Sequence, residues 1–260
     1  MIESILLTIA RITTFEGDRI LTGASGFLFE REGRMHLVTS RHVLFDEPSG
    51  HRPDRVEIEL HADEDDLVHV TVLSVLLYKD GKSIWKDAKD AGGPVDVAVI
   101  ELDRAALPPV VHAFDPTHLL SDLHAVRVGT PLLLIGFPLG FHDTVHHLPV
   151  VRQAIVASSF GLRFQGQGYF LSDARTHRGL SGAPVVMRDE QAQGSLPWKL
   201  LGVHSSSMDM RTRDKEQDDP LGLHCVWYAD ILMALTHPDA AAPQEEAPDS
   251  KDAQKAPPPA

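Results

Sequence analysis

The sequence has little cysteine, little positive charge and no long apolar run, and each shortage excludes a class of protein. A single cysteine, Cys225, rules out a disulfide within the chain and favours a reducing compartment. The formal net charge of -13 at pH 7 disfavours general binding to nucleic acid or to anionic membranes, because their phosphates would repel the protein. No segment offers the roughly 18 uninterrupted apolar residues of a membrane-spanning helix, so we expect no membrane span.

Targeting and nucleotide-binding signals are missing too. The apolar residues 1–15 are interrupted by Glu3 and Arg11, and they lack both a basic leader and a small-residue cleavage site. We therefore expect no signal peptide and a cytoplasmic location. Neither a Gly-x-x-x-x-Gly-Lys string nor a Gly-x-Gly-x-x-Gly string is found, so the sequence predicts no nucleotide cofactor.

Short apolar runs rich in Val, Ile, Leu and Phe are abundant instead, and they predict an all-β fold. The first series lies at residues 5–12, 26–29, 36–39, 56–60, 68–77 and 95–102. The second series lies at residues 130–136, 150–157, 169–172, 183–187, 200–205 and 223–227. Two similar series predict two packed antiparallel six-stranded β-barrels, with Cys225 in the core.

A segment that carries Pro108, Pro109 and Pro116 separates the two series. We expect one folded domain over residues 1–238, made of an N-terminal barrel (about 1–105), a linker (about 104–124) and a C-terminal barrel (about 125–238). Residues 239–260 are rich in Pro, Ala and charge and contain no large apolar residue. Such a composition cannot offset the entropy of ordering, so we expect a disordered tail.

One helix is predicted, over residues 228–236 at the C-terminal end of the domain. Ile231, Leu232 and Leu235 would share a face there, and Pro238 prevents continuation. The charged run RTRDKEQDDP, residues 211–220, predicts an exposed loop between two strands.

Three strings carry the parts of an activated serine nucleophile. LVTSRHVL, VDVAVIEL and HRGLSGAPVV surround His42, Asp96 and Ser181, in that order along the chain, and each is embedded in apolar residues that indicate strands. A serine hydroxyl becomes a useful nucleophile when an imidazole takes its proton, and a carboxylate fixes the tautomer of that imidazole. Glycines beside the serine allow backbone N–H groups to point at a developing oxyanion.

Each of these residues also has an ordinary structural interpretation. His42 alone could be a core histidine, Asp96 could simply begin a strand, and Ser181 could belong to a turn. Their joint order and setting favour the catalytic interpretation.

The string around Ser181 resembles the nucleophile loop Gly-x-Ser-Gly-Gly-Pro of chymotrypsin-fold serine proteases, with Ala183 in place of the last glycine. SRHV resembles the Thr-Ala-Ala-His string of that family. LLLIGFPLG (residues 132–140), VDVAVIEL and Asp173 extend the resemblance to bacterial proteases of the high-temperature-requirement type. Most of residues 1–237 is covered, and we expect no peptide-binding domain after them.

This resemblance implies a serine endopeptidase that acts on proteins or peptides and needs neither a metal nor a cofactor. The catalytic residues would be His42, Asp96 and Ser181. The backbone amides of Gly179 and Ser181 would form the oxyanion hole, and Ser205 would support Asp96. The competing interpretation is a peptide-binding or sensor module with the same fold and without appreciable turnover.

One departure concerns activation. Digestive members of the family have an aspartate just before the serine, which pairs with a new N-terminus, whereas this chain has Leu180. We expect the enzyme to be competent as translated, or to be controlled by loops around Gly179.

A faint specificity signal adds to the resemblance. In glutamyl endopeptidases, and in viral proteases that cut after glutamine, a histidine and a threonine at the positions of His204 and Thr176 bind the P1 side chain. Arg175 or Arg178 would add positive potential for a Glu or Gln at P1. The alternative is that His204 is a structural strand residue and Thr176 a loop hydroxyl.

The histidine-rich string FHDTVHHLP has two interpretations, a metal site or a solvated loop. His142 and His146 have the spacing of two ligands on a helix, but nearby prolines and glycines favour a solvated loop.

Overall fold

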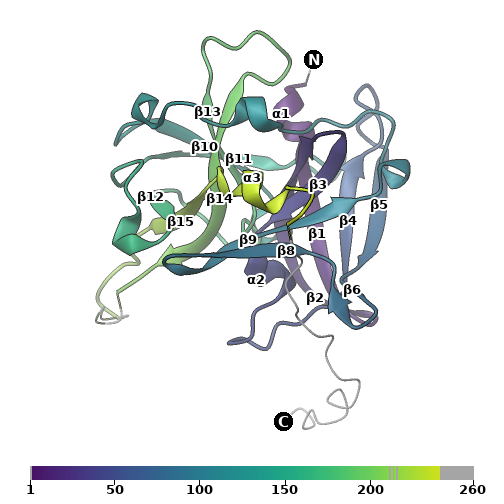
Figure 1. Cartoon of the computed structure of the whole chain (residues 1–260), viewed down its shortest axis with the longest axis horizontal. Helices are drawn as coiled ribbons and strands as arrows, with labels where there is room; N and C mark the ends of the chain where they lie inside the picture. The colour runs from purple at the N-terminus through teal and green to yellow at the C-terminus, as the bar shows by residue number, and fades with distance from the viewer. Residues whose placement is uncertain (1, 211, 213, 215, 241–260) are drawn as a thin grey trace.

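The computed structural model describes residues 2–210, 212, 214 and 216–240, and it is built almost entirely of antiparallel strands. Figure 1 shows two sheets side by side, the first in purple to blue and the second in teal to yellow. The first has the order β5-β4-β1-β2-β3-β9-β8, with β1 (Ile9–Glu16), β2 (Arg19–Arg31), β3 (Arg34–Thr39), β4 (Arg55–His61), β5 (Val70–Leu76), β8 (Lys86–Asp90) and β9 (Gly93–Leu102). β6 (Tyr78–Lys79) and β7 (Lys82–Ser83) form a small separate hairpin.

The second sheet follows the order β11-β10-β13-β14-β15-β12. Its strands are β10 (Pro131–Gly136), β11 (Val150–Ile155), β12 (Tyr169–Ser172), β13 (Pro184–Arg188), β14 (Trp198–Met208) and β15 (Leu223–Tyr228). A bridge between Val156 and Ser172 joins its two outer strands, so this sheet curves round on itself. The all-β prediction is confirmed, as is the core position of Cys225.

Three apolar clusters show how the sheets pack. One lies within the first sheet around Leu37 and Trp85, and another lies within the second around Phe170 and Val185. The third contains side chains of both sheets, including Phe27, Val97 and Trp227, and so packs them face to face. The strings around His42, Asp96 and Ser181 each contribute side chains to this shared cluster.

The connecting segments contain several short turns of 3-10 helix. Three turns of 3-10 helix occur in the segment between the sheets: η1 (Arg104–Ala106), η2 (Pro116–His118) and η3 (Leu123–Ala125). Two more lie in the second half, η4 (Pro138–Gly140) and η5 (Phe164–Gly166). No helix among the described residues has the length and apolar character to cross a membrane.

Several elements differ from the sequence-based expectation. The first apolar run begins as a helical turn, α1 (Ser4–Leu7), before β1. The predicted helix at 228–236 is shorter, α3 (Ile231–Leu235), because Tyr228 still pairs with Gly202 as the last residue of β15. The first sheet gains a seventh strand, β8, whose sequence KDAKD lacks an apolar run.

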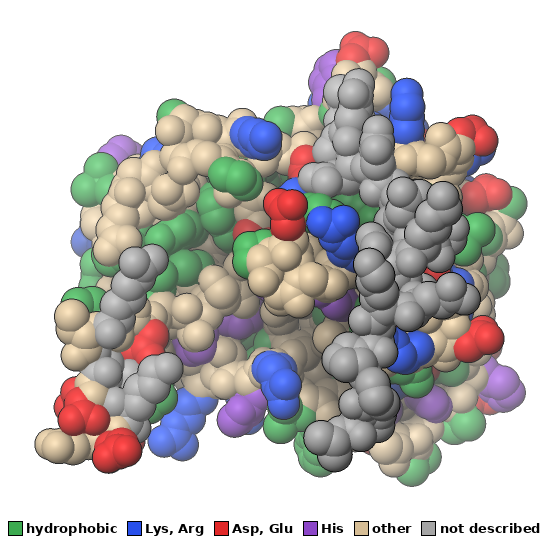
Figure 2. All heavy atoms as spheres, turned by 90° about the horizontal axis from the view of Figure 1, so that it is seen from below, with side chains coloured by type: hydrophobic (Ala, Val, Ile, Leu, Met, Phe, Trp, Pro, Cys, Tyr) green, Lys and Arg blue, Asp and Glu red, His purple; other side chains and the backbone are tan. Residues whose placement is uncertain are grey.

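The charged segments near the C-terminal end of the chain lie at the surface where the structure describes them. The described residues of the predicted loop 211–220 are exposed and lie outside strands, and most of the predicted tail, residues 241–260, lies outside the described residues. On the part of the face drawn in colour in Figure 2, basic and acidic side chains are interspersed rather than gathered into one basic patch.

Candidate active site

His42 lies on a single helical turn, α2 (Arg41–Leu44), and not on a strand as its apolar neighbours suggested. Val43 and Leu44 are buried and fix this turn against the first sheet. The backbone N–H of His42 donates to Oδ1 of Asp96 at 2.8 Å, which ties the turn to β9. The backbone of His42 is thereby anchored to Asp96, independently of the contacts of its side chain.

The three side chains that the sequence analysis singled out lie within hydrogen-bond distance of one another. His42 Nδ1 is 2.7 Å from Oδ2 of Asp96, and His42 Nε2 is 2.8 Å from Oγ of Ser181. Ser205, on β14, donates a hydrogen bond to the same Oδ2. The arrangement therefore links a hydroxyl to an imidazole and the imidazole to a carboxylate, across both sheets.

Electrostatics favour a protonated imidazole at this position. Burial by itself would lower the pKa of His42, but the hydrogen bond and the charge of Asp96, with a smaller contribution from Asp46, raise it above the ordinary value of 6.5. The neutral form, which can accept a proton from Ser181, is thus dominant only at higher pH.

We expect the pH profile of activity to show this shift. kcat/KM should fall about tenfold per pH unit on the acid side, with a midpoint above 6.5, because protonated His42 cannot act as a base. Initial rates with a saturable peptide substrate between pH 5 and 9 measure it. Asp46→Asn should move the midpoint to lower pH, and a wild-type midpoint below 6.5 would contradict the assignment.

Backbone geometry around Ser181 depends on two glycines with positive φ, Gly179 at 95° and Gly182 at 85°. A Cβ on Gly182 would lie 2.2 Å from the carbonyl oxygen of Ser25 and from Oγ1 of Thr39, so only glycine fits there. Within the described part of the chain, the backbone N–H groups of Gly179 and Ser181 donate to no acceptor. They are free to bind a negatively charged oxygen.

A cleft of about 470 Å³ opens beside these amides. His42, Gly179 and Ser181 line it together with Asp46 and Arg178. Arg178 is exposed and stands in this cleft, whereas Arg175 is exposed and makes no hydrogen bond or ion pair with the described residues. The structure thus brings one of the two predicted arginines to the catalytic groups.

Thr176 and His204 are linked through a residue that the sequence analysis did not single out, His224. The Thr176 hydroxyl lies 2.9 Å from Nδ1 of His224, and the ring centroids of His204 and His224 are 5.4 Å apart. His224 is the second residue of β15 and lies between Leu223 and the apolar residues CVW, so its sequence setting indicates a core strand. Only the pairing of β14 with β15 shows that the two histidines are neighbours.

Burial favours the neutral forms of His204 and His224. Burial, and then the nearby charges of His224 and His42, lower the pKa of His204 to about 3. Burial also lowers the pKa of His224, opposed by its hydrogen bond with the backbone of Ala174. Nδ1 of His204 is buried without a partner among the described residues. A neutral imidazole with an unused nitrogen is suited to a polar, uncharged partner.

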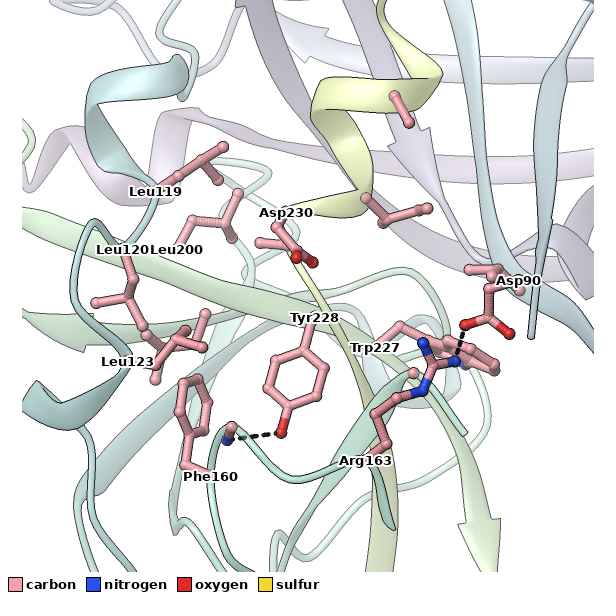
Figure 3. Close-up of a pocket in the computed structure, with 17 residues that line it drawn as sticks. Asp90, Leu119, Leu120, Leu123, Phe160, Arg163, Leu200, Trp227, Tyr228 and Asp230 are labelled. Carbon is pink, nitrogen blue, oxygen red and sulfur yellow. Dashed lines mark hydrogen bonds and ion pairs between the residues drawn. The ribbon is translucent and has the colours of Figure 1, made fainter. Parts of the chain in front are cut away.

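A second cavity, of about 460 Å³, lies elsewhere (Figure 3). Leucines of the linker and the rings of Phe160, Trp227 and Tyr228 line it, and the ion pair of Asp90 with Arg163 lies at one side. None of His42, Asp96 and Ser181 lines this cavity, so it is separate from the cleft beside Ser181.

The histidine-rich string forms a loop between β10 and β11, as predicted. His146 pairs with Asp143 at 2.8 Å, and His147 lies 3.2 Å from Glu59 on β4. The contact between His147 and Glu59 joins the loop to the first sheet.

Comparison with known proteins shows similarity to serine proteases. The chain is 24% identical over 181 residues to "Serine protease HTRA2, mitochondrial" from Drosophila pseudoobscura pseudoobscura and, equally, from Drosophila persimilis. That match covers 69% of this chain and 35% of each relative, so the chain spans about a third of their length.

A solved structure shares the fold. The serine endoprotease from Yersinia pestis superposes with a TM-score of 0.52 at 15% identity, over 88% of this chain and 61% of that one. The family model described as a trypsin-like peptidase domain matches residues 24–194, which is more than half of the chain. The chain therefore belongs to the trypsin-like peptidase family.

Proposed function

We propose that this chain is a serine endopeptidase that hydrolyses peptide bonds through an acyl-enzyme on Ser181. The observation that carries the proposal is the continuous relay from Asp96 through His42 to Ser181, with contacts of 2.7 and 2.8 Å. Membership of the trypsin-like peptidase family supports the same reaction. A binding module would not require such a relay.

The chemistry follows from the contacts. Ser181 Oγ attacks the scissile carbonyl while Nε2 of His42 takes its proton, and Asp96 stabilises the imidazolium that forms. The free amides of Gly179 and Ser181 would bind the oxyanion, an effect worth about 3 kcal/mol per donor in other enzymes. His42 then protonates the leaving amine, and water hydrolyses the acyl-enzyme by the reverse sequence.

We also propose that the P1 side chain is Glu or Gln and that Thr176 and His204 bind it. His224 orients Thr176 through the 2.9 Å contact and stands against the His204 ring. Because burial keeps both imidazoles neutral, these side chains suit the uncharged amide of Gln directly. Binding of a Glu carboxylate would be accompanied by proton uptake, onto either the histidine or the carboxylate.

A peptide library digested at several pH values tests both proposals. We expect cleavage mainly after Gln and Glu, with the ratio of kcat/KM for Glu to that for Gln rising as the pH falls from 8 to 5.5, because acid supplies the proton that Glu binding takes up. Sequencing the products by mass spectrometry gives the P1 residue, and His204→Val should reduce the preference for both residues.

The possible failures are distinct. Cleavage mainly after Lys, Arg or large apolar residues would overturn the P1 assignment and leave the endopeptidase proposal in place. No cleavage of any peptide at any pH would overturn the endopeptidase proposal itself.

A further inference from the structure

Ser25 is a fully buried hydroxyl on β2 that no catalytic role yet explains. The pairing of β2 with β3 begins two residues later, at Phe27, so the backbone of β3 does not pair with the N–H of Ser25. It is used across the domain instead: the Ser25 N–H donates to the carbonyl oxygen of Ser181 at 3.0 Å. The first sheet therefore holds the nucleophile's own peptide.

The Ser25 side chain holds an earlier peptide of the same loop, the one between Gly179 and Leu180. Its hydroxyl accepts a hydrogen bond from the backbone N–H of Phe137 at 2.9 Å and donates one to the carbonyl oxygen of Gly179 at 2.7 Å. A hydroxyl has one proton, and the Phe137 N–H cannot accept it, so the proton points to Gly179. This bond fixes the orientation of the Gly179–Leu180 peptide.

The peptide on the other side of Gly179 is fixed by the same neighbouring segment. Leu139 N–H donates to the carbonyl oxygen of Arg178 at 2.6 Å. In a trans peptide the C=O and N–H groups point in opposite directions. Anchoring the Arg178 oxygen toward Leu139 therefore turns the N–H of Gly179 away from Leu139, and that N–H is one of the two free amides of the proposed oxyanion hole.

We propose that Ser25 is a positioning residue that orients the oxyanion hole by holding the Gly179 carbonyl. The inference rests on the proposed function, because the direction of the Gly179 N–H affects the rate only if that group binds the oxyanion of a peptidase reaction. Gly179 has a positive φ and no Cβ, so its flanking peptides can rotate easily unless neighbouring groups hold them. Leu180 supplies no carboxylate that could pair with another group, and the loop depends on these neutral hydrogen bonds.

Tight packing around the hydroxyl agrees with this role. A Cβ on Gly136 would lie 2.4 Å from Oγ of Ser25 and 2.9 Å from a methyl carbon of Leu180. Gly136 thus leaves room for the hydroxyl to stand between Phe137 and Gly179. Gly136→Ala would displace the hydroxyl without removing it, and so perturbs the same contact by a different route.

The test compares Ser25→Ala with wild type in kinetics and in inhibitor binding. We expect kcat to fall about 10- to 100-fold with KM changed less than about twofold, because the lost orientation affects the transition state more than the bound substrate. Affinity for a peptide boronic acid, whose adduct with Ser181 places an oxygen in the oxyanion hole, should fall by the same factor. Affinity of a product peptide should not change.

Thr39→Val is the matched control. It removes another buried hydroxyl next to Ser25. The Thr39 hydroxyl donates to the Ser25 carbonyl oxygen at 2.9 Å and makes no hydrogen bond with Gly179 among the described residues. Its kcat should stay near that of wild type even if its melting temperature falls. Melting curves of all variants show whether each is folded, and Gly136→Ala should reproduce the kcat loss if Ser25→Ala does not fold.

The outcomes separate the two proposals. An active wild type whose kcat and boronate affinity are unchanged in Ser25→Ala would overturn the positioning role alone. A proportional fall in Ser25→Ala and Thr39→Val would also overturn it, since the effect would then be one of general packing. A wild type without any turnover would overturn the proposed function first.

Discussion

Replacing Ser181 by Ala should lower kcat by about 10⁶-fold, the largest effect expected from any single substitution in this chain. The hydroxyl is the atom that forms the acyl-enzyme, and no other hydroxyl or thiol is hydrogen-bonded to His42 among the described residues. Binding of substrate should persist, because the change removes only one oxygen. Progress curves at high enzyme concentration measure the residual rate, and isothermal titration with a product peptide measures binding.

Labelling with a fluorophosphonate probe, which bonds covalently to an activated serine, tests the same role of Ser181. Wild-type protein should be labelled at Ser181, whereas Ser181→Ala and His42→Ala should not be, since the probe reports a serine whose proton is accepted by an imidazole. Ser74→Ala, which removes an exposed hydroxyl on β5 outside the site, serves as the control and should retain labelling. A wild type that binds peptides but is never labelled would favour the peptide-binding module over the enzyme.

Much of the fold was predictable because its signals are local. The apolar runs predict each strand that contains one, and the strings around His42, Asp96 and Ser181 carry the resemblance to the family. β8 was missed because its polar residues form a strand only through pairing with β9. The α2 turn was missed because Val43 and Leu44 suit a strand as well as a helix.

The finer parts of the site depend on contacts between distant residues. Ser25 is 154 positions from Gly179 in sequence, and its own surroundings indicate only a strand. His224 becomes a neighbour of His204 and Thr176 only when β15 pairs beside β14. No periodicity or motif in a single sequence predicts these contacts, because they follow from the order of the strands in the folded sheets.

Replacing Asp96 by Asn should lower kcat by about 10⁴-fold while the protein stays folded. Asp96 accepts hydrogen bonds from the backbone and Nδ1 of His42 and from Ser205, and an amide of the same shape can accept at only one of its two ends. If its NH₂ group faces the imidazole, His42 takes the tautomer with the proton on Nε2, which cannot accept the proton of Ser181.

The matched control for this change is Asp87→Asn, which removes a carboxylate paired with Arg41, the residue beside His42, and should leave kcat within about threefold of wild type. Loss of the Asp96 charge should also lower the pKa of His42, because that charge and its hydrogen bond are the causes that raise it. The residual activity of Asp96→Asn should therefore reach its plateau at lower pH than wild type. A rate loss of less than tenfold, or an unchanged acid limb, would mean that Asp96 neither fixes the tautomer nor stabilises the imidazolium, and the relay inferred from the 2.7 Å contact would not be the catalytic one.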